Sequence, residues 1–261
     1  MLSFPDLGKR AKFILLSGVL ALSFAVTFIL PSGVWLASVF ISTAVSAVGV
    51  WLFFGRGWGR GSNFLLILPV LFVMSTGFVQ YLFPHLSIWF RVVFWLGFGA
   101  VFYLLLLVLN ILFVAGRRGD LPLIRPAKTA LFFAEILTAF FGFSIIFKGV
   151  SFLALQSFLV VILSLLLGLV FFSGFELDSS GLRGSLFQGG ALITWAAIQS
   201  FMALSFVPLK SFSRALCLAV VFYMLLGVAR EYVEHRLNKR SIWEYLALLI
   251  LLGVTVFKLP R

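Results

Sequence analysis

The chain has very little charge, and most of that charge is positive. Only 11% of its 261 residues are charged, whereas hydrophobic residues make up 62%. A soluble globular domain carries roughly 25% charged residues, so this composition argues against a soluble fold. The acidic residues number 8 against 20 basic ones, and the aspartates are Asp6, Asp120 and Asp178. So few carboxylates argue against a catalytic centre with two metal ions.

Cysteine and the common catalytic motifs are also scarce. The single cysteine, Cys217, lies in an apolar run, so an intramolecular disulfide is excluded. The chain contains no His-Glu-x-x-His, Gly-x-Ser-x-Gly or paired-cysteine motif, and His85 and His235 are expected on opposite faces of the membrane. We therefore expect no cofactor and no bound metal, and an enzyme is the less favoured class. The absence of an Asn-x-Ser/Thr sequon fits a bacterial inner membrane.

Long apolar blocks are what the chain has in abundance. A transmembrane helix needs about 20 predominantly apolar residues, and these blocks do not alternate polar and apolar residues as barrel strands do. The sequence predicts an all-α, polytopic transmembrane helix bundle in which residues 1–261 form a single membrane domain. It has about nine spans, or eight if the last does not cross. The expected spans are 13–30, 34–54, 64–82, 88–115, 129–147, 150–173, 186–207, 212–229 and 242–257.

The basic residues predict the orientation of the bundle. With a cytoplasmic N-terminus, the outer segments hold only Arg91, Lys148, Lys210, Arg214, Lys258 and Arg261 of the 20 basic residues. This positive-inside distribution predicts a multi-pass protein of the cell (inner) membrane. It also explains the net charge of +12 and makes anionic lipids of the cytoplasmic face expected partners. No basic, aromatic soluble face is present to bind nucleic acid.

Short segments recur in the same order in the two halves of the chain. They are Arg60-Gly61-Ser62 with Arg183-Gly184-Ser185, and Val101-Phe102-Tyr103 with Val221-Phe222-Tyr223. These matches predict parallel four-helix repeats at 9–118 and 125–240, followed by an appended helix at 241–261. Unequal spacing inside the fourth helix of each half counts against duplication, and chance similarity between apolar helices is the alternative.

Glu135 is the one carboxylate expected well inside a span. A charge there is costly, so by default it indicates a functional site. Asn110 and Glu135 lie about equally far from the turn between the fourth and fifth spans, so they are expected at one depth, where Asn110 could hydrogen-bond a protonated Glu135. Polar contact between helices is the simpler reading, and a proton or cation site is the alternative.

Other polar residues give weaker candidates. Gln156, Gln199, Tyr103 and Tyr223 are expected to bond or pack between helices, or to line a polar path. The loop residues Arg56, Gly57, Gly59 and Arg60 could hold a phosphate or lipid headgroup, although a flexible cytoplasmic turn is the simpler reading. Arg230 and Glu234 have the spacing of an ion pair on one helix face.

Three functions stay open on this evidence. The favoured one is a non-enzymatic bundle that transports, or helps to translocate, a small or lipid-like solute. The second is a structural or accessory subunit that binds another membrane protein or a second copy of the chain. The third is a membrane-embedded lipid-modifying enzyme, for which the chain offers few titratable groups.

Overall fold

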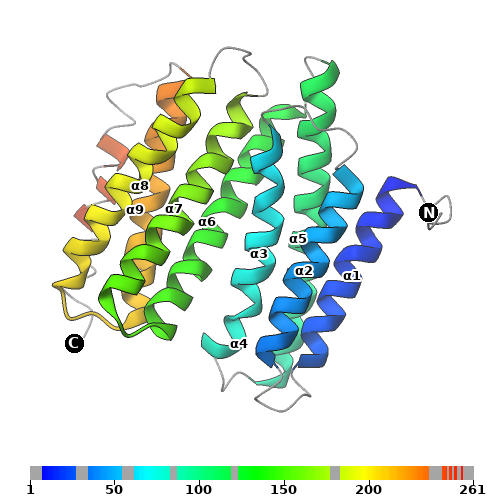
Figure 1. Ribbon diagram of the computed structural model, residues 1–261, viewed down its shortest axis with the longest axis horizontal. Coiled ribbons are helices and arrows are strands. Elements are labelled where there is room, and N and C mark those ends of the chain that lie inside the picture. The colour runs from blue at the N-terminus through cyan, green and yellow to red at the C-terminus, as the bar shows by residue number, and fades with distance from the viewer. Residues whose placement is uncertain are drawn as a thin grey trace. The chain divides into compact units, whose positions relative to one another are not determined.

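The computed structural model of the chain is a set of helices (Figure 1). It describes residues 8–27, 35–54, 62–82, 87–118, 123–176, 183–234, 243–245, 247–248, 250–251 and 254. The described part is 93% helical and contains no strand, which confirms the predicted all-α class. The chain divides into two compact units, Met1–Ala134 and Glu135–Arg261.

The first unit is built around four helices that form a ring, in which each helix packs against two others. They are α1 (Lys9–Thr27), α2 (Trp35–Phe54), α3 (Ile67–Gly77) and α5 (Ile88–Arg118), with the 3₁₀ segment η2 (Ser62–Leu66) before α3 and the short α4 (Val79–Leu82) after it. Helix α1 packs against α2 and α5, and α3 packs against α2 and α5. Sequence neighbours in this ring run in opposite directions (Figure 1), as short connections require.

Aromatic rings fill the middle of the first unit. The ring of Phe24 stacks on Trp95 with 4.9 Å between centroids and meets the edge of Phe98 at 5.2 Å. Phe98 in turn stacks on Phe72 at 5.7 Å and on Phe102 at 5.9 Å. All five side chains are buried. Such pairs add about 0.5–1.5 kcal/mol each beyond the area that they bury, so this cluster fixes how α1, α3 and α5 meet.

Small residues bring α1 close to its neighbours. The hydroxyl groups of Ser23 and Ser42 lie 2.9 Å apart, which joins α1 to α2. A Cβ atom at Gly99 would lie 3.1 Å from the Cβ of Ala21, so α5 and α1 approach closely there. Small residues at helix contacts are typical of membrane bundles, because lipid tails supply no hydrophobic force between helices.

The second unit also contains four long helices. The division between the units falls within α6 (Ile124–Gly149), which is followed by α7 (Leu153–Glu176), α8 (Arg183–Ser205) and α9 (Ser211–Val233). Three phenylalanines of α6 pack on rings from α8 and α9. The pairs and their centroid distances are Phe140–Phe212 at 5.5 Å, Phe143–Phe222 at 5.9 Å and Phe147–Phe201 at 5.6 Å.

Helices α7 and α8 touch backbone to backbone. A Cβ atom at Gly168 would lie 3.1 Å from the Cα of Gly190 and 3.4 Å from its carbonyl oxygen. The hydroxyl of Thr194 donates to that same carbonyl at 2.7 Å. A side chain at residue 168 would therefore require the two backbones to shift apart, and glycine fits this contact without such a shift.

Five helices of the described part are long and apolar enough to cross a membrane. They are Trp35–Phe54, Ile88–Val114, Ile124–Gly149, Leu153–Phe175 and Ser211–Val233. The predicted count of about nine is not confirmed. Helix α3 is short because a 3₁₀ turn precedes it and a break at Phe78 follows it. The predicted ninth span at 242–257 lies mostly outside the described residues.

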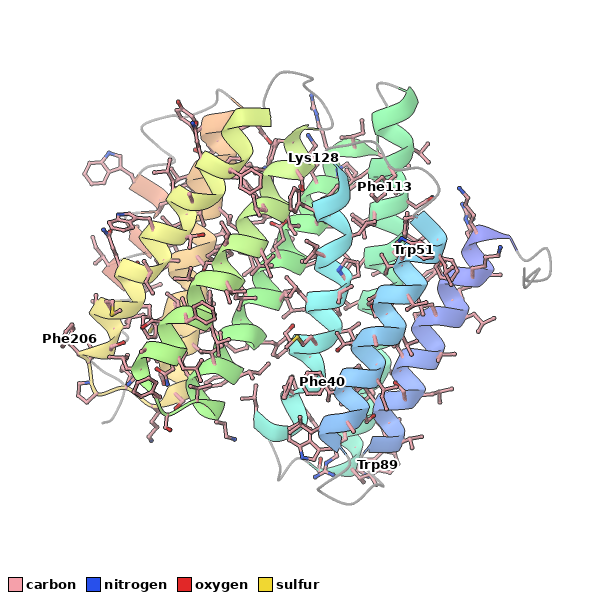
Figure 2. All side chains as sticks on the ribbon, in the orientation of Figure 1. Phe40, Trp51, Trp89, Phe113, Lys128 and Phe206 are labelled. Atoms are coloured by element: carbon pink, nitrogen blue, oxygen red, sulfur yellow. The ribbon has the colours of Figure 1, made fainter. Side chains whose placement is uncertain are left out.

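Large apolar side chains cover much of the outer surface. Trp89 at the start of α5 is 79% exposed, and Trp51 lies near the other end of this unit, on α2 (Figure 2). Phe40 on α2 and Trp195 on α8 are exposed as well. A soluble protein rarely exposes so much contiguous apolar surface, whereas lipid covers it at no cost, and tryptophan is enriched near membrane interfaces.

Candidate intramembrane acid site

Glu135 lies near the middle of α6, the 26-residue helix that is shared by the two units. Alanine, leucine and phenylalanine dominate this stretch, and straight-chain residues and alanine favour a helix. The side chain of Glu135 is 0% exposed, and Leu131, Thr138 and Ala139 on the same helix are buried too. The carboxyl group therefore lies in a mainly apolar setting.

Both carboxyl oxygens of Glu135 lack a hydrogen-bond partner among the residues that the structure describes. An ionised carboxylate without a partner is very costly away from water. The group is stable there when it carries a proton or when a bound cation neutralises it. A buried acid that can exchange its proton is the element from which intramembrane proton relays are built.

The predicted partner of Glu135 belongs to the other unit. Asn110 is half-buried on α5 in the first unit, whereas Glu135 is the first residue of the second. The predicted meeting of these two residues at one depth stays a prediction.

The other polar candidates are dispersed over the helices and do not hydrogen-bond Glu135. Gln156 is buried near the start of α7, and its amide nitrogen donates to the carbonyl of Val150, six residues earlier. It therefore bonds to the connection between α6 and α7, and its expected role between helices or along a polar path stays a prediction. Gln199 is exposed on α8. Tyr103 and Tyr223 are half-buried on α5 and α9, the last long helix of each unit.

The predicted headgroup loop is not described. Arg56, Gly57, Gly59 and Arg60 lie in the gap between α2 and η2, outside the described residues. Within the described ranges, no group of three or more histidine, cysteine, aspartate or glutamate residues could hold a metal ion.

Two contacts near the end of α9 refine the sequence analysis. Arg230 and Glu234 form the predicted ion pair, with 3.1 Å between Nε and Oε1. Sequence reasoning missed a second contact, in which the hydroxyl of Tyr245 donates to Oε1 of Glu231 at 3.3 Å. A Cβ at Gly227 would lie 2.5 Å from that hydroxyl oxygen, so the bare glycine is the one signal that could have predicted the contact.

The helices, their lipid-compatible surface and a buried acid define the class of the protein as a helical membrane protein. Residues 34–258 match a family described as "Protein of unknown function (DUF5656)". The match covers most of the chain, and the chain belongs to this family. No curated protein and no solved structure matches the chain.

Proposed function

We propose that the chain is a non-enzymatic membrane protein that moves, or helps to move, a small or lipid-like solute, and that Glu135 carries a proton in that process. One observation carries the proposal: Glu135 is fully buried, and neither carboxyl oxygen has a partner among the described residues. Its helix is long and apolar enough to cross a membrane. If Glu135 served only to hold two helices together, its carboxyl group would be expected to form a hydrogen bond to a residue of another helix.

The setting of Glu135 favours a proton over a metal cation. Ca²⁺ takes about 6–8 oxygen ligands, and Mg²⁺ about six in strict geometry. The buried neighbours of Glu135 on α6 are mainly apolar, with the hydroxyl of Thr138 as an exception. A proton needs a single oxygen, and the neutral acid that results is tolerated in an apolar bundle.

The proposal extends to the arrangement of the chain in the cell membrane. The N-terminus is cytoplasmic, about nine spans cross, and two parallel four-helix repeats are followed by an appended helix. The order of helix packing supports the repeats: α1, α2, α3 and α5 contact one another in turn, and α7, α8 and α9 do so as well, with α6 packed on α8 and α9. Glu135 makes the two halves chemically unequal, because Val19 stands near the matching point of the first span.

Reconstitution of the full chain tests the function. Phosphatidylcholine vesicles loaded with a pH-sensitive dye would receive a potassium diffusion potential, and the rate of internal acidification would be measured. In parallel, movement of a fluorescent phospholipid between leaflets would be followed by quenching from outside. We expect the wild-type chain to exceed protein-free vesicles in at least one assay.

Two variants make the test specific to the buried acid. Glu135→Gln should reduce the rate to that of protein-free vesicles, because it keeps the shape of the side chain and removes the exchangeable proton. Glu234→Gln, at the solvent-accessible end of α9, should leave the rate unchanged. Equal rates for wild type and Glu135→Gln would remove Glu135 from the mechanism. No flux in either assay with wild-type protein would reject both solute classes, and capture of a membrane partner would then favour the accessory role.

A further inference from the structure

Arg214 is a half-buried cation with no carboxylate beside it among the residues that the structure describes. It lies in the first turn of α9, inside a helix that can span a membrane. One terminal nitrogen of its guanidinium donates to the carbonyl of Leu209 at 3.4 Å, and the guanidinium carbon lies 5.6 Å from the ring centre of Phe147. Its Nε atom is buried and has no hydrogen-bond partner among the described residues. A guanidinium has five donors, so this one is largely unsatisfied.

Another arginine of the same helix shows what is missing. Arg230, in the last turn of α9, is paired with the carboxylate of Glu234 at 3.1 Å. It also lies at the helix end where the backbone dipole favours a cation. Arg214 has neither advantage, because it lies at the opposite end and is not ion-paired to any described carboxylate.

The surroundings of Arg214 add positive charge. Lys210 occupies the N-cap position of α9 and makes no capping hydrogen bond with its side chain. The first hydrogen bond of this helix runs from the backbone amide of Arg214 to the carbonyl of Lys210, at 3.0 Å. The backbone amides of the three residues between them therefore have no acceptor within the helix. Two cationic residues thus lie at or within the first turn of α9, at the positive end of the helix dipole, and an anion is the natural counterpart.

The flanking side chains indicate what kind of anion fits. Phe206, in the turn between α8 and α9, is 88% exposed (Figure 2). Phe212 and Leu216 on α9 are exposed as well. An anion bound here would have large apolar side chains beside it, where acyl chains can lie.

We propose that Arg214, with the first turn of α9 and Lys210, binds the phosphate group of a phospholipid headgroup. Arginine suits this role because its planar fork binds two phosphate oxygens at once. The ring of Phe147 holds the guanidinium from one side, and only one of its terminal nitrogens has a described acceptor, the carbonyl of Leu209. This site contains none of the residues of the predicted arginine loop at 56–60 and does not depend on the proposed proton role of Glu135.

Retention of lipid by the full-length protein tests this site. Protein purified in detergent would be exposed to phosphatidylglycerol, and the bound lipid would be counted by native mass spectrometry as a function of its concentration. Arg214→Gln should weaken retention about tenfold, the effect of losing one charge-assisted contact. Arg214→Lys should weaken it less, because it keeps the charge without the fork.

The matched control is Arg91→Gln, in the first turn of α5, the corresponding position of the first unit. It should leave retention unchanged. If Arg214→Gln and Arg91→Gln retain phosphatidylglycerol as well as wild type does, the site does not exist. Competition with inorganic phosphate separates the two sources of a phosphate: displacement at millimolar concentration indicates a free-anion site and contradicts the lipid assignment, and no displacement supports it.

A measurement on the wild-type protein covers the case in which the variants do not fold. Phosphatidylglycerol that carries a photoreactive group near its phosphate would be crosslinked in vesicles of phosphatidylcholine, and the labelled peptides would be identified. The site predicts labelling concentrated in 205–216 and around Phe147. Labelling spread evenly over the lipid-facing helices, or concentrated near residues 56–60, would contradict it.

Discussion

The third helix differs sharply between the two units. In the first unit it is broken into η2, α3 and α4, and the regular part, α3, has only 11 residues. In the second unit, α8 runs unbroken for 23 residues. The contacts of the two helices differ as well: Gly77 lies against the side chains of Phe24 and Val39, whereas Gly190 lies directly on the backbone of Gly168.

The two units also differ in their polar groups. In the first unit, the hydroxyl groups of Ser23 and Ser42 bond to each other, and Ser23 also donates to a helix carbonyl, whereas the buried hydroxyl of Ser46 has no partner among the described residues. The second unit contains a buried acid and an arginine, neither of which has an oppositely charged partner among the described residues. Buried groups without a partner are costly, and the two units differ in that those of the second include ionisable side chains.

Removing a buried central ring from one unit should give the largest loss of stability and shows whether the two units unfold separately. Phe24→Ala and Phe143→Ala each delete a fully buried ring, one from each unit, and each should cost about 3–5 kcal/mol in free energy of unfolding. The buried thiol of Cys217 reports on the second unit alone. Denaturant titration with thiol labelling should therefore expose Cys217 early in Phe143→Ala and near the wild-type midpoint in Phe24→Ala. Equal shifts in both variants would show that the two units unfold as one.

Glycine substitution should give the next largest effect. Gly168→Ala places a Cβ 3.1 Å from the backbone of Gly190 and should destabilise the protein by about 1–3 kcal/mol. Gly97→Ala, in α5, has open space around the new atom and should be neutral or stabilising by up to about 1 kcal/mol, because alanine favours helices. Thermal unfolding in detergent checks both variants. A stable Gly168→Ala would show that α7 and α8 can separate without loss.

The serine contact should have the smallest effect. Ser23→Ala, Ser42→Ala and the double variant form a cycle whose coupling energy should be about 0.6 kcal/mol, the average for polar contacts between membrane helices. The same thermal measurement gives the coupling. A coupling near zero would mean that the bond of each hydroxyl to its own helix matters more than the bond between them.

The helices themselves could be predicted from the sequence, because long apolar blocks between charged gaps leave few other structures. The ten described helices and helical segments from α1 to α9 overlap the first eight expected spans. The break after α3 could not be predicted, since Pro69 lies inside α3 while the chain bends at Phe78. Glu135 could be selected as a buried acid because it is isolated in an apolar run. That Glu135 has no described partner could not be predicted. The partners of a side chain depend on how the helices are rotated against each other, and the periodicity of a uniformly apolar block does not determine this rotation.

The surroundings of Arg214 could not be predicted from the sequence either. The sequence places it near the outer end of a span, where an arginine is expected to extend its charged end toward water. The structure holds it instead over Phe147 with a buried, unpartnered nitrogen. The ring that holds it belongs to α6, far away in the sequence, so no local pattern could reveal the contact.

Carbodiimide labelling tests most directly the central claim that Glu135 takes up a proton inside the bundle. A membrane-soluble carbodiimide reacts with protonated carboxyl groups in apolar surroundings, whereas a water-soluble carbodiimide reacts at the surface. Mass spectrometry of the full chain in vesicles should find the first reagent on Glu135 and the second on the exposed Glu244. Glu135→Gln should remove the first adduct alone. Labelling of Glu244 by both reagents with none on Glu135 would contradict the claim.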